Sequence, residues 1–231
     1  MNCAVESIER HTWSMLIAAV QHDIVWEDAP ATRAALEPRL AAAAAAGARL
    51  IVLAEMFATG FSLDGDAVAE APDGPSVTWM ADQARSLGCW IAGSLAIDTG
   101  SGRPVNRLVA AEPEGELTTY DKRHPFSFGK EPEVYDAGED LATVEIDGMI
   151  WGLTVCYDLR FSYDYWSRAN DLDGYLVVAN WPRPRREHWQ ALLRARAVEN
   201  LAYVIGVNRA CLLYTSPSPR DRTRSRMPSS A

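Results

Sequence analysis

The sequence predicts an α/β fold in which two β-sheets pack against each other and helices cover them. Apolar runs of strand length recur along the chain, separated by alanine-rich or amphipathic segments of helical length. Two hairpin signals, at residues 112–116 and at Asp147-Gly148, argue against a purely parallel, doubly wound sheet. The 231 residues, 48% of them apolar, are enough for one such domain with a sizeable core.

In the first half of the chain, apolar runs predict strands at residues 16–21, 49–54, 89–97, 108–111 and 117–120, the last two forming a hairpin. Two helices are expected between these strands. The alanine-rich segment 29–46 stops at Gly47, and segment 76–87 is capped by Ser76 and closed by Gly88. An acidic residue, Glu55, stands directly after the strand at 49–54.

The second half begins with a charged loop at residues 121–125, which runs into a segment, 126–135, rich in turn formers. Strands are expected at residues 142–146, 149–155, 174–179 and 203–207, and helices at 163–170 and 187–200. The apolar run 149–155 ends abruptly at Cys156 and is followed by polar residues.

The two ends of the chain differ from the rest in composition. Residues 1–14 lack the basic start and apolar core of a signal peptide, so we interpret them as a leader outside the fold, with Met15 as a working start. We expect the folded domain to span residues 15–214. Residues 215–231, with five Ser, three Pro and four Arg, are too polar to order themselves. They could be a natural disordered tail, but they look more like translated adaptor or vector sequence replacing missing C-terminal strands.

Composition excludes several classes of function. A net charge of −9 does not favour binding to nucleic acid or to an anionic membrane. There is no Cys-x-x-Cys, no His-Glu-x-x-His and no dinucleotide-binding glycine fingerprint. No apolar run approaches the 18 or so residues of a membrane-spanning helix. A reducing, cytoplasmic location best fits the four scattered cysteines, Cys3, Cys89, Cys156 and Cys211.

Three polar residues at predicted strand ends form a candidate catalytic set. A lone cysteine usually only packs, but Cys156 is accompanied by Glu55 and Lys122, each at another strand end. Acyl transfer needs a thiolate nucleophile, a base and a cation for the oxyanion, which these residues could supply. Lys122 is also expected to favour the thiolate, and the backbone N–H of Tyr157 is a natural second oxyanion donor.

Each of these residues also has a simpler interpretation. Glu55 could cap a loop or merely pair with Lys122, and Lys122 could be a solvated charge in a charged loop. His124 is a rival base, because a Cys–His pair would perform the same class of reaction.

Five segments together resemble the nitrilase superfamily of carbon–nitrogen hydrolases, and most closely its ω-amidase branch. These segments are LIVLAEMFATGFS, YDKRHPFSFGKE, GLTVCYDLRF, NWP and LLRARAVEN, in family order within about residues 15–209. The resemblance implies that Glu55 is the general base, Lys122 the stabiliser of the tetrahedral intermediate and Cys156 the nucleophile. It also implies that Glu131 is a second carboxylate that positions the lysine or the substrate.

The resemblance further implies a four-layer αββα sandwich, a homodimer formed through helices, and no metal or organic cofactor. Beyond Arg209, members of the family continue with further strands, which the sequence here does not match. We therefore expect the C-terminal strands to be missing or replaced. A folded but inactive relic, or an interaction subunit, is the corresponding non-enzymatic alternative.

ω-Amidases hydrolyse the terminal amide of 2-oxoglutaramate and 2-oxosuccinamate, so the resemblance implies a substrate with a remote carboxylate. An arginine is suited to hold that group, and Arg160, Arg183 and Arg185 are candidates. Arg160 could instead be an ion-pair partner of Asp158, and Trp181 could line the pocket or simply pack. Arg194 and Arg196 are expected to support the fold. Nitriles, N-carbamoyl amino acids and other amides are alternative substrates for the same three residues.

Overall fold

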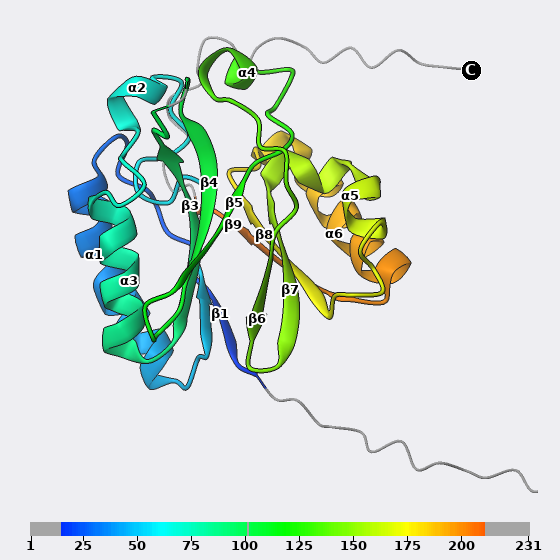
Figure 1. Cartoon of the computed structure of the whole chain (residues 1–231), viewed down its shortest axis with the longest axis horizontal. Coiled ribbons are helices and arrows are strands. Elements are labelled where there is room, and N and C mark those ends of the chain that lie inside the picture. The colour runs from blue at the N-terminus through cyan, green and yellow to red at the C-terminus, as the bar shows by residue number, and fades with distance from the viewer. Residues whose placement is uncertain (1–14, 101, 211–231) are drawn as a thin grey trace, which may run out of the picture.

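The computed structural model describes residues 15–100 and 102–210, which form two β-sheets packed face to face with helices on their outer sides (Figure 1). The expected α/β sandwich is therefore confirmed. The proposed leader at 1–14 and the tail at 215–231 lie outside the described residues, so the expected domain limits and the missing C-terminal strands stay predictions.

The first sheet has the strand order β1-β2-β3-β4-β5. Strands β1 to β3 run parallel, and β3, β4 and β5 pair antiparallel as a meander. The strands span Ile17–Ala19 (β1), Leu50–Val52 (β2), Trp90–Ile97 (β3), Val105–Ala111 (β4) and Leu117–Asp121 (β5).

The second sheet has the order β6-β7-β8-β9, and only its first pair is antiparallel. The strands span Thr143–Ile146 (β6), Met149–Val155 (β7), Gly174–Ala179 (β8) and Tyr203–Asn208 (β9). As expected, β6 and β7 are joined at Asp147 and Gly148, both of which have a positive φ, at 49° and 78°.

Helices α1 (Ala29–Ala45) and α3 (Pro75–Leu87) cover the outer face of the first sheet, while α5 (Ser162–Trp166) and α6 (Arg186–Asn200) lie outside the second (Figure 1). Four short helical turns lie in the connections: α2 (Gly65–Val68), α4 (Glu131–Val134), and the 3₁₀ turns η1 (Cys156–Arg160) and η2 (Arg183–Arg185).

Alternation along the strands separates the layers. In β2, the side chains of Leu50 and Val52 join the core between the two sheets, whereas Ile51 packs against the α1 and α3 layer. In β8, Leu176 points to the core between the sheets and Val177 to the α5 and α6 layer. Because neighbouring residues of a strand face opposite sides, both central strands are apolar throughout.

One local expectation needs correction. Ser76 does not cap α3: the cap position is Gly74, Pro75 opens the helix, and both the backbone N–H and the hydroxyl of Ser76 donate to Glu70. Segment 126–135, rich in turn formers, also contains the short helix α4. The expected end of α3 at Gly88 is confirmed, since this residue has a φ of 62°.

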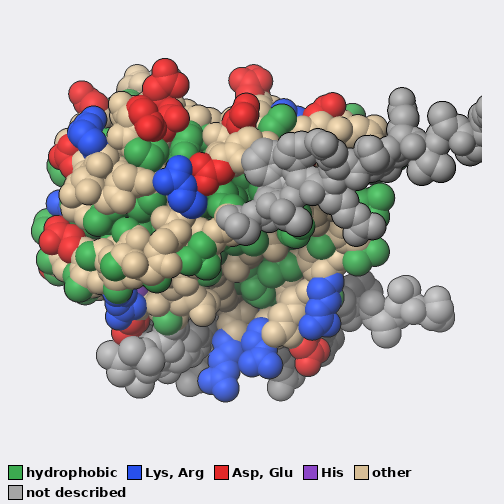
Figure 2. All heavy atoms as spheres, turned by 90° about the horizontal axis from the view of Figure 1, so that it is seen from below, with side chains coloured by type: hydrophobic (Ala, Val, Ile, Leu, Met, Phe, Trp, Pro, Cys, Tyr) green, Lys and Arg blue, Asp and Glu red, His purple; other side chains and the backbone are tan. Residues whose placement is uncertain are grey.

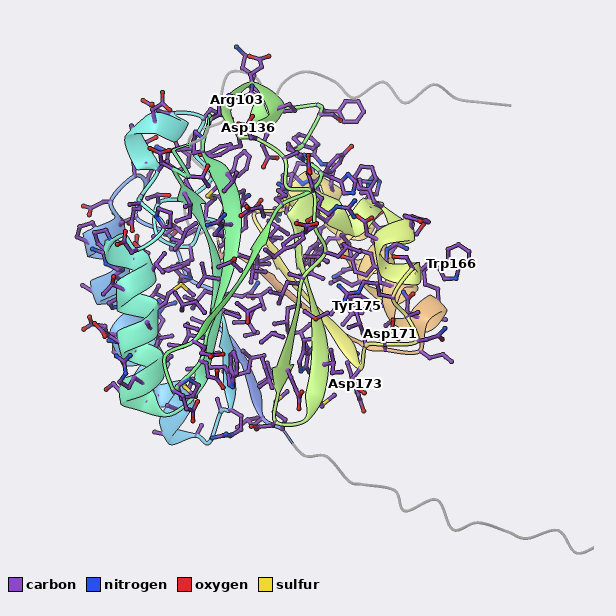
Figure 3. All side chains as sticks on the ribbon, viewed as in Figure 1. Arg103, Asp136, Trp166, Asp171, Asp173 and Tyr175 are labelled. Atoms are coloured by element: carbon purple, nitrogen blue, oxygen red, sulfur yellow. The ribbon has the colours of Figure 1, made fainter. Side chains whose placement is uncertain are left out.

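The surface carries charges of both signs among apolar side chains, as the view from below shows (Figure 2). On the helical side of the second sheet, Trp166 points outward from α5 and is 68% exposed (Figure 3). At the opposite end of the molecule from the β6–β7 turn, Arg103 pairs with Asp136 at 2.7 Å. Within the described ranges, none of the helices is long and apolar enough to cross a membrane.

Candidate active site

Three strand ends bring the predicted catalytic residues together. Glu55 follows β2, Lys122 comes directly after β5, and Cys156 comes directly after β7 of the other sheet. Glu55 and Lys122 are 0% and 1% exposed, so neither is the solvated surface charge that the simpler interpretation allows. The site therefore lies where the same ends of the two sheets meet.

The Lys122 ammonium is held between two carboxylates. Its Nζ donates to Glu55 Oε1 at 2.9 Å and to the two oxygens of Glu131 at 2.8 and 2.9 Å. Glu131 is 0% exposed and lies at the start of α4. The burial of Lys122 disfavours its charge, but the two carboxylates outweigh this effect and raise its pKa well above the usual value. Lys122 is therefore a permanent cation.

The Glu55 carboxylate is oriented by neutral donors as well as by the lysine. Asn106 Nδ2 donates to its Oε1 at 2.8 Å, and the backbone N–H of Asn180 donates to its Oε2 at 2.7 Å. The side-chain amide of Asn180 also donates to the backbone carbonyl of Glu55. Bonds to both oxygens fix the plane of the carboxylate, as positioned acid–base catalysis requires.

Cys156 sits on a sharp turn between β7 and η1. Its φ is 49°, in the left-handed region that a residue with a side chain seldom occupies. Such strained residues cluster at functional sites, where the surrounding structure holds them in place. The amide groups in the first turn of a helix have no partner within the helix, so the N–H of Tyr157, the second residue of η1, stays a candidate oxyanion donor.

The electrostatic environment favours the thiol form of Cys156. Burial raises its pKa well above the ordinary value, and the Glu55 carboxylate raises it further, while Lys122 opposes both effects. Lys122 thus favours the thiolate, as expected, but its effect is outweighed by burial and by Glu55. Because two carboxylates surround one ammonium, the site carries an excess negative charge before the thiol ionises, and the thiol needs a base at the moment of attack.

A third buried carboxylate, Asp158, lies two residues after Cys156. It accepts hydrogen bonds from the backbone N–H of Val155 at 2.9 Å, the hydroxyl of Tyr120 at 2.8 Å and the backbone N–H of His124 at 2.9 Å. Burial raises its pKa to about 6. Its two oxygens are thus occupied by other groups, and the alternative in which it pairs with Arg160 is wrong.

His124 does not face the thiol as a rival base. Its Nε2 lies 2.7 Å from Asp164 Oδ2, and its ring stacks on Phe161 with 3.7 Å between the ring centroids. Arg123 bonds the other oxygen of Asp164 at 2.6 Å. These contacts tie the loop after Lys122 to α5.

Two of the candidate arginines lie on aromatic rings near Cys156. The Arg160 guanidinium lies 4.9 Å from the ring centre of Trp181 and 5.9 Å from that of Tyr157, and it bonds His188 at 3.2 Å. Arg185 lies 5.2 Å from the ring centre of Phe126, which itself contacts Tyr157. The side chain of Arg183 is exposed and, within the described part of the chain, makes no hydrogen bond or ion pair with the site.

Trp181 both packs in the core and supports the Arg160 guanidinium. It is 6% exposed, its ring lies 5.4 Å from that of Trp189, and its Nε1 donates to the carbonyl of Arg185. Arg196 supports the fold as expected, because it donates from α6 to the carbonyl of Leu159.

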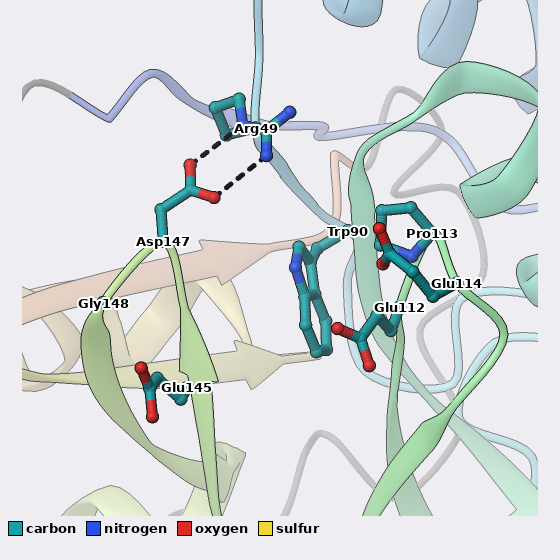
Figure 4. Close-up of a pocket in the computed structure, with 8 residues that line it drawn as sticks. All are labelled: Arg49, Trp90, Glu112, Pro113, Glu114, Glu145, Asp147 and Gly148. Atoms are coloured by element: carbon teal, nitrogen blue, oxygen red, sulfur yellow. Dashed lines mark hydrogen bonds and ion pairs between the residues drawn. The ribbon is translucent and has the colours of Figure 1, made fainter.

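A separate hollow of about 370 Å³ lies at the far end of the sandwich (Figure 4). Arg49 and Asp147 join across it by a bidentate ion pair of 2.9 and 3.0 Å. This hollow is polar and contains none of the predicted catalytic residues. It is lined by Arg49, Trp90, Glu112, Pro113, Glu114, Glu145, Asp147 and Gly148.

Comparison with known proteins identifies the family of this chain. The profile of the carbon-nitrogen hydrolase family matches residues 16–225. The chain belongs to this family. It is 46% identical over 194 residues to the omega-amidase YafV of Escherichia coli K12, covering 84% of this chain and 73% of that protein. It is 34% identical over 167 residues to the 2-oxoglutaramate amidase of Bacillus subtilis, covering 70% of this chain and 63% of that protein. These relatives support the ω-amidase branch of the nitrilase superfamily.

Solved structures give the same fold for this hydrolase. A CN-hydrolase superfamily protein from Xanthomonas campestris, described with an arsenic adduct in its active site, is 42% identical, with a TM-score of 0.78. That match covers 84% of this chain and 76% of the other. Nit3 of Saccharomyces cerevisiae, at 24% identity and a TM-score of 0.80 over 87% of this chain and 77% of its own, supports the fold alone.

The sequence interpretation missed three residues that hold the site of this hydrolase. Asn180 directly follows β8, so the strand-end rule that identified Glu55 would also have found it. Asn106 is a buried amide in β4, and a buried amide signals a polar partner. Tyr120 gave no signal, because a tyrosine in a strand normally only packs.

Proposed function

We propose that this hydrolase cleaves the terminal amide of 2-oxo dicarboxylate monoamides, such as 2-oxoglutaramate and 2-oxosuccinamate, to the 2-oxo acid and ammonia. The observation that carries the proposal is the meeting of a thiol, a buried ammonium and an oriented carboxylate at Cys156, Lys122 and Glu55. The names of the omega-amidase and 2-oxoglutaramate amidase relatives support the choice of substrate.

In the first half-reaction the Cys156 sulfur attacks the amide carbon while Glu55 takes the thiol proton. The oxygen of the tetrahedral intermediate becomes negative, and Lys122 and the N–H of Tyr157 stabilise it. Lys122 has three protons, which it donates to Glu55 and to both oxygens of Glu131, so one of these bonds must turn to the new oxygen as its charge develops. Glu55 then gives its proton to the nitrogen, the carbon–nitrogen bond breaks, and ammonia leaves behind a thioester.

In the second half-reaction Glu55 takes a proton from water, and the resulting hydroxide attacks the thioester carbon. The carbon–sulfur bond breaks, the sulfur regains a proton from Glu55, and the carboxylic acid product leaves. Glu131 shares Lys122 with Glu55 and keeps the ammonium in place through both steps. All proton transfers are thus made by one residue whose orientation is fixed.

The carboxylate of the substrate is assigned to Arg160. This guanidinium sits on the rings of Trp181 and Tyr157, which hold it in place four residues after the nucleophile. Among the described residues it has no carboxylate partner within ion-pair distance, so its charge is available to a ligand. Arg185 on Phe126 is a second cation on the same aromatic group.

The decisive experiment measures ammonia release from 2-oxoglutaramate, glutaramate, a nitrile and an N-carbamoyl amino acid. We expect the 2-oxo substrate to be preferred and Cys156→Ala to abolish its hydrolysis. Arg160→Gln should raise the KM for 2-oxoglutaramate much more than Arg194→Gln, the matched change on α6. A preference for the nitrile or the N-carbamoyl substrate, or an unchanged rate in Cys156→Ala, would refute the proposal.

We also infer that the working enzyme is a homodimer joined through helices α5 and α6. Their outer side exposes large apolar side chains, and such a patch is typical of a surface that another protein covers. Tyr163, Trp166, Val198 and Leu201 are 69%, 68%, 74% and 95% exposed.

A further inference from the structure

Asp158 is a buried charged group that the proposed reaction does not use. It lies two residues after Cys156 and is 0% exposed. Its carboxylate accepts hydrogen bonds from neutral donors only, and the positive charge of Lys122 acts on it without a direct bond. Burying a carboxylate without a paired cation costs free energy of folding. This cost indicates that Asp158 has a role beside Cys156.

Its three hydrogen bonds join the two parts of the chain that must meet for the reaction. Oδ2 accepts from the N–H of Val155, the residue just before Cys156, and so closes the turn on which the sulfur sits. The same oxygen accepts from Tyr120 in β5, and Oδ1 accepts from the N–H of His124. Tyr120 and His124 stand two residues before and two residues after Lys122 in the chain.

The nucleophile and the ammonium belong to different sheets, and this carboxylate bonds to both segments at once. Val155 and Cys156 continue the second sheet, while Tyr120 and Lys122 belong to the first. A neutral amide could not replace the carboxylate without loss. An asparagine would turn an NH₂ group toward at least one of the N–H donors of Val155 and His124, leaving it unpaired.

We propose that Asp158 is a positioning residue that sets the Cys156 sulfur relative to the Lys122 ammonium by clamping both strand ends. The inference rests on the proposed function for the roles of those two residues. Tyr120 is the arm of the clamp on the first sheet, and its hydroxyl is the group that can be removed with least disturbance. Neither Asp158 nor Tyr120 needs to touch the substrate.

The experiment compares Tyr120→Phe with Tyr175→Phe. Both remove one hydroxyl from a tyrosine that is 2% exposed; Tyr175 donates to the Tyr165 carbonyl at 2.6 Å on the outer side of the second sheet (Figure 3). We expect both changes to lower the free energy of unfolding, measured with urea, by a similar amount. Only Tyr120→Phe should lower kcat, by about tenfold with KM unchanged, because a small misplacement of reacting groups is expensive.

A second readout follows the rate of alkylation of Cys156 by iodoacetamide against pH, which needs no amide hydrolysis. We expect this profile to shift in Tyr120→Phe and Asp158→Asn and to stay in place in Tyr175→Phe. If kcat and the alkylation profile of Tyr120→Phe match those of Tyr175→Phe, the inference is overturned. If the wild-type enzyme releases no ammonia, the proposed function fails, while the alkylation profiles still decide the clamp.

Discussion

At the scale of single residues, the site works through an imbalance of charge. One ammonium, Lys122, faces two carboxylates, Glu55 and Glu131, before Cys156 contributes any charge. Burial and this imbalance together favour the thiol form of Cys156, so in the proposed reaction Glu55 accepts its proton. A cysteine that is activated only when substrate arrives is also protected from chance oxidation and alkylation, because the thiolate is the reactive form.

The first prediction concerns the protonation of Cys156. Its alkylation rate should still be rising with pH at the ordinary thiol value of 9, because burial and, after it, Glu55 raise the pKa of Cys156 above that value. In Glu55→Gln the opposing charge of Lys122 is less compensated, so the pKa falls and alkylation at neutral pH becomes faster, although amide hydrolysis is lost. A wild-type plateau below pH 9, or slower alkylation in Glu55→Gln, would contradict this account.

The second prediction concerns the cost of removing the ammonium. Lys122→Met leaves two buried carboxylates without a cation and should lower the free energy of unfolding by about 3–5 kcal/mol. Lys130→Met is the control, since its pair with Glu133 is 3.7 Å long and largely exposed, and it should change stability by about 0.5 kcal/mol or less. Urea unfolding measures both, and equal effects would show that the buried cluster is not the source of stability.

At the scale of elements, the strands position the chemistry because each ends on a polar side chain at one edge of its sheet. This regularity made Glu55, Lys122 and Cys156 visible in the sequence, and the apolar runs predicted the strands well. The predicted start of α3 at Ser76 was wrong because Pro75, whose ring fixes a helical φ, already begins the helix one residue earlier. The contacts of Asn106, Tyr120 and Asp158 join residues far apart in the chain, and no local pattern records such a contact.

The third prediction tests the close packing of β8. A Cβ added at Gly174 would lie 2.5 Å from Trp151 Cζ3 and 2.9 Å from the carbonyl oxygen of Tyr203 in the neighbouring strand. Because that ring is buried and the carbonyl is backbone, Gly174→Ala should cost about 1–3 kcal/mol, with a lower midpoint of thermal unfolding. Gly88→Ala, which meets no atom within 4 Å but has a φ of 62°, isolates backbone strain. A larger loss at Gly88 than at Gly174 would refute the packing argument.

At the scale of the whole molecule, the two sheets hold complementary functions. The first carries Lys122 and the proposed base Glu55. The second carries the proposed nucleophile Cys156 and, on its outer side, helices with exposed apolar side chains. The Asp164 contacts to Arg123 and His124 connect these helices to the loop that follows Lys122. Assembly through α5 would therefore bear on a segment next to the site.

The fourth prediction concerns this assembly. Replacing Trp166 by glutamate puts a charge into the centre of the proposed interface and should convert a dimer into a monomer in analytical ultracentrifugation. Trp26→Glu is the matched control, because Trp26 is also exposed, at 55%, but lies before α1 on the other side of the molecule. A dimer that survives the Trp166 change, or a wild-type monomer, would exclude this interface.

The division of the site between the sheets has a consequence for how the polypeptide could be cut. Residues 137–142, which contain no helix or strand, separate the portion bearing Glu55, Lys122 and Glu131 from the portion bearing Cys156. Neither fragment made by cleavage there would hydrolyse amides alone. Amide hydrolysis would return only when the two fragments recombine through the apolar core between the sheets. This scaffold would therefore serve as a split-enzyme reporter of proximity.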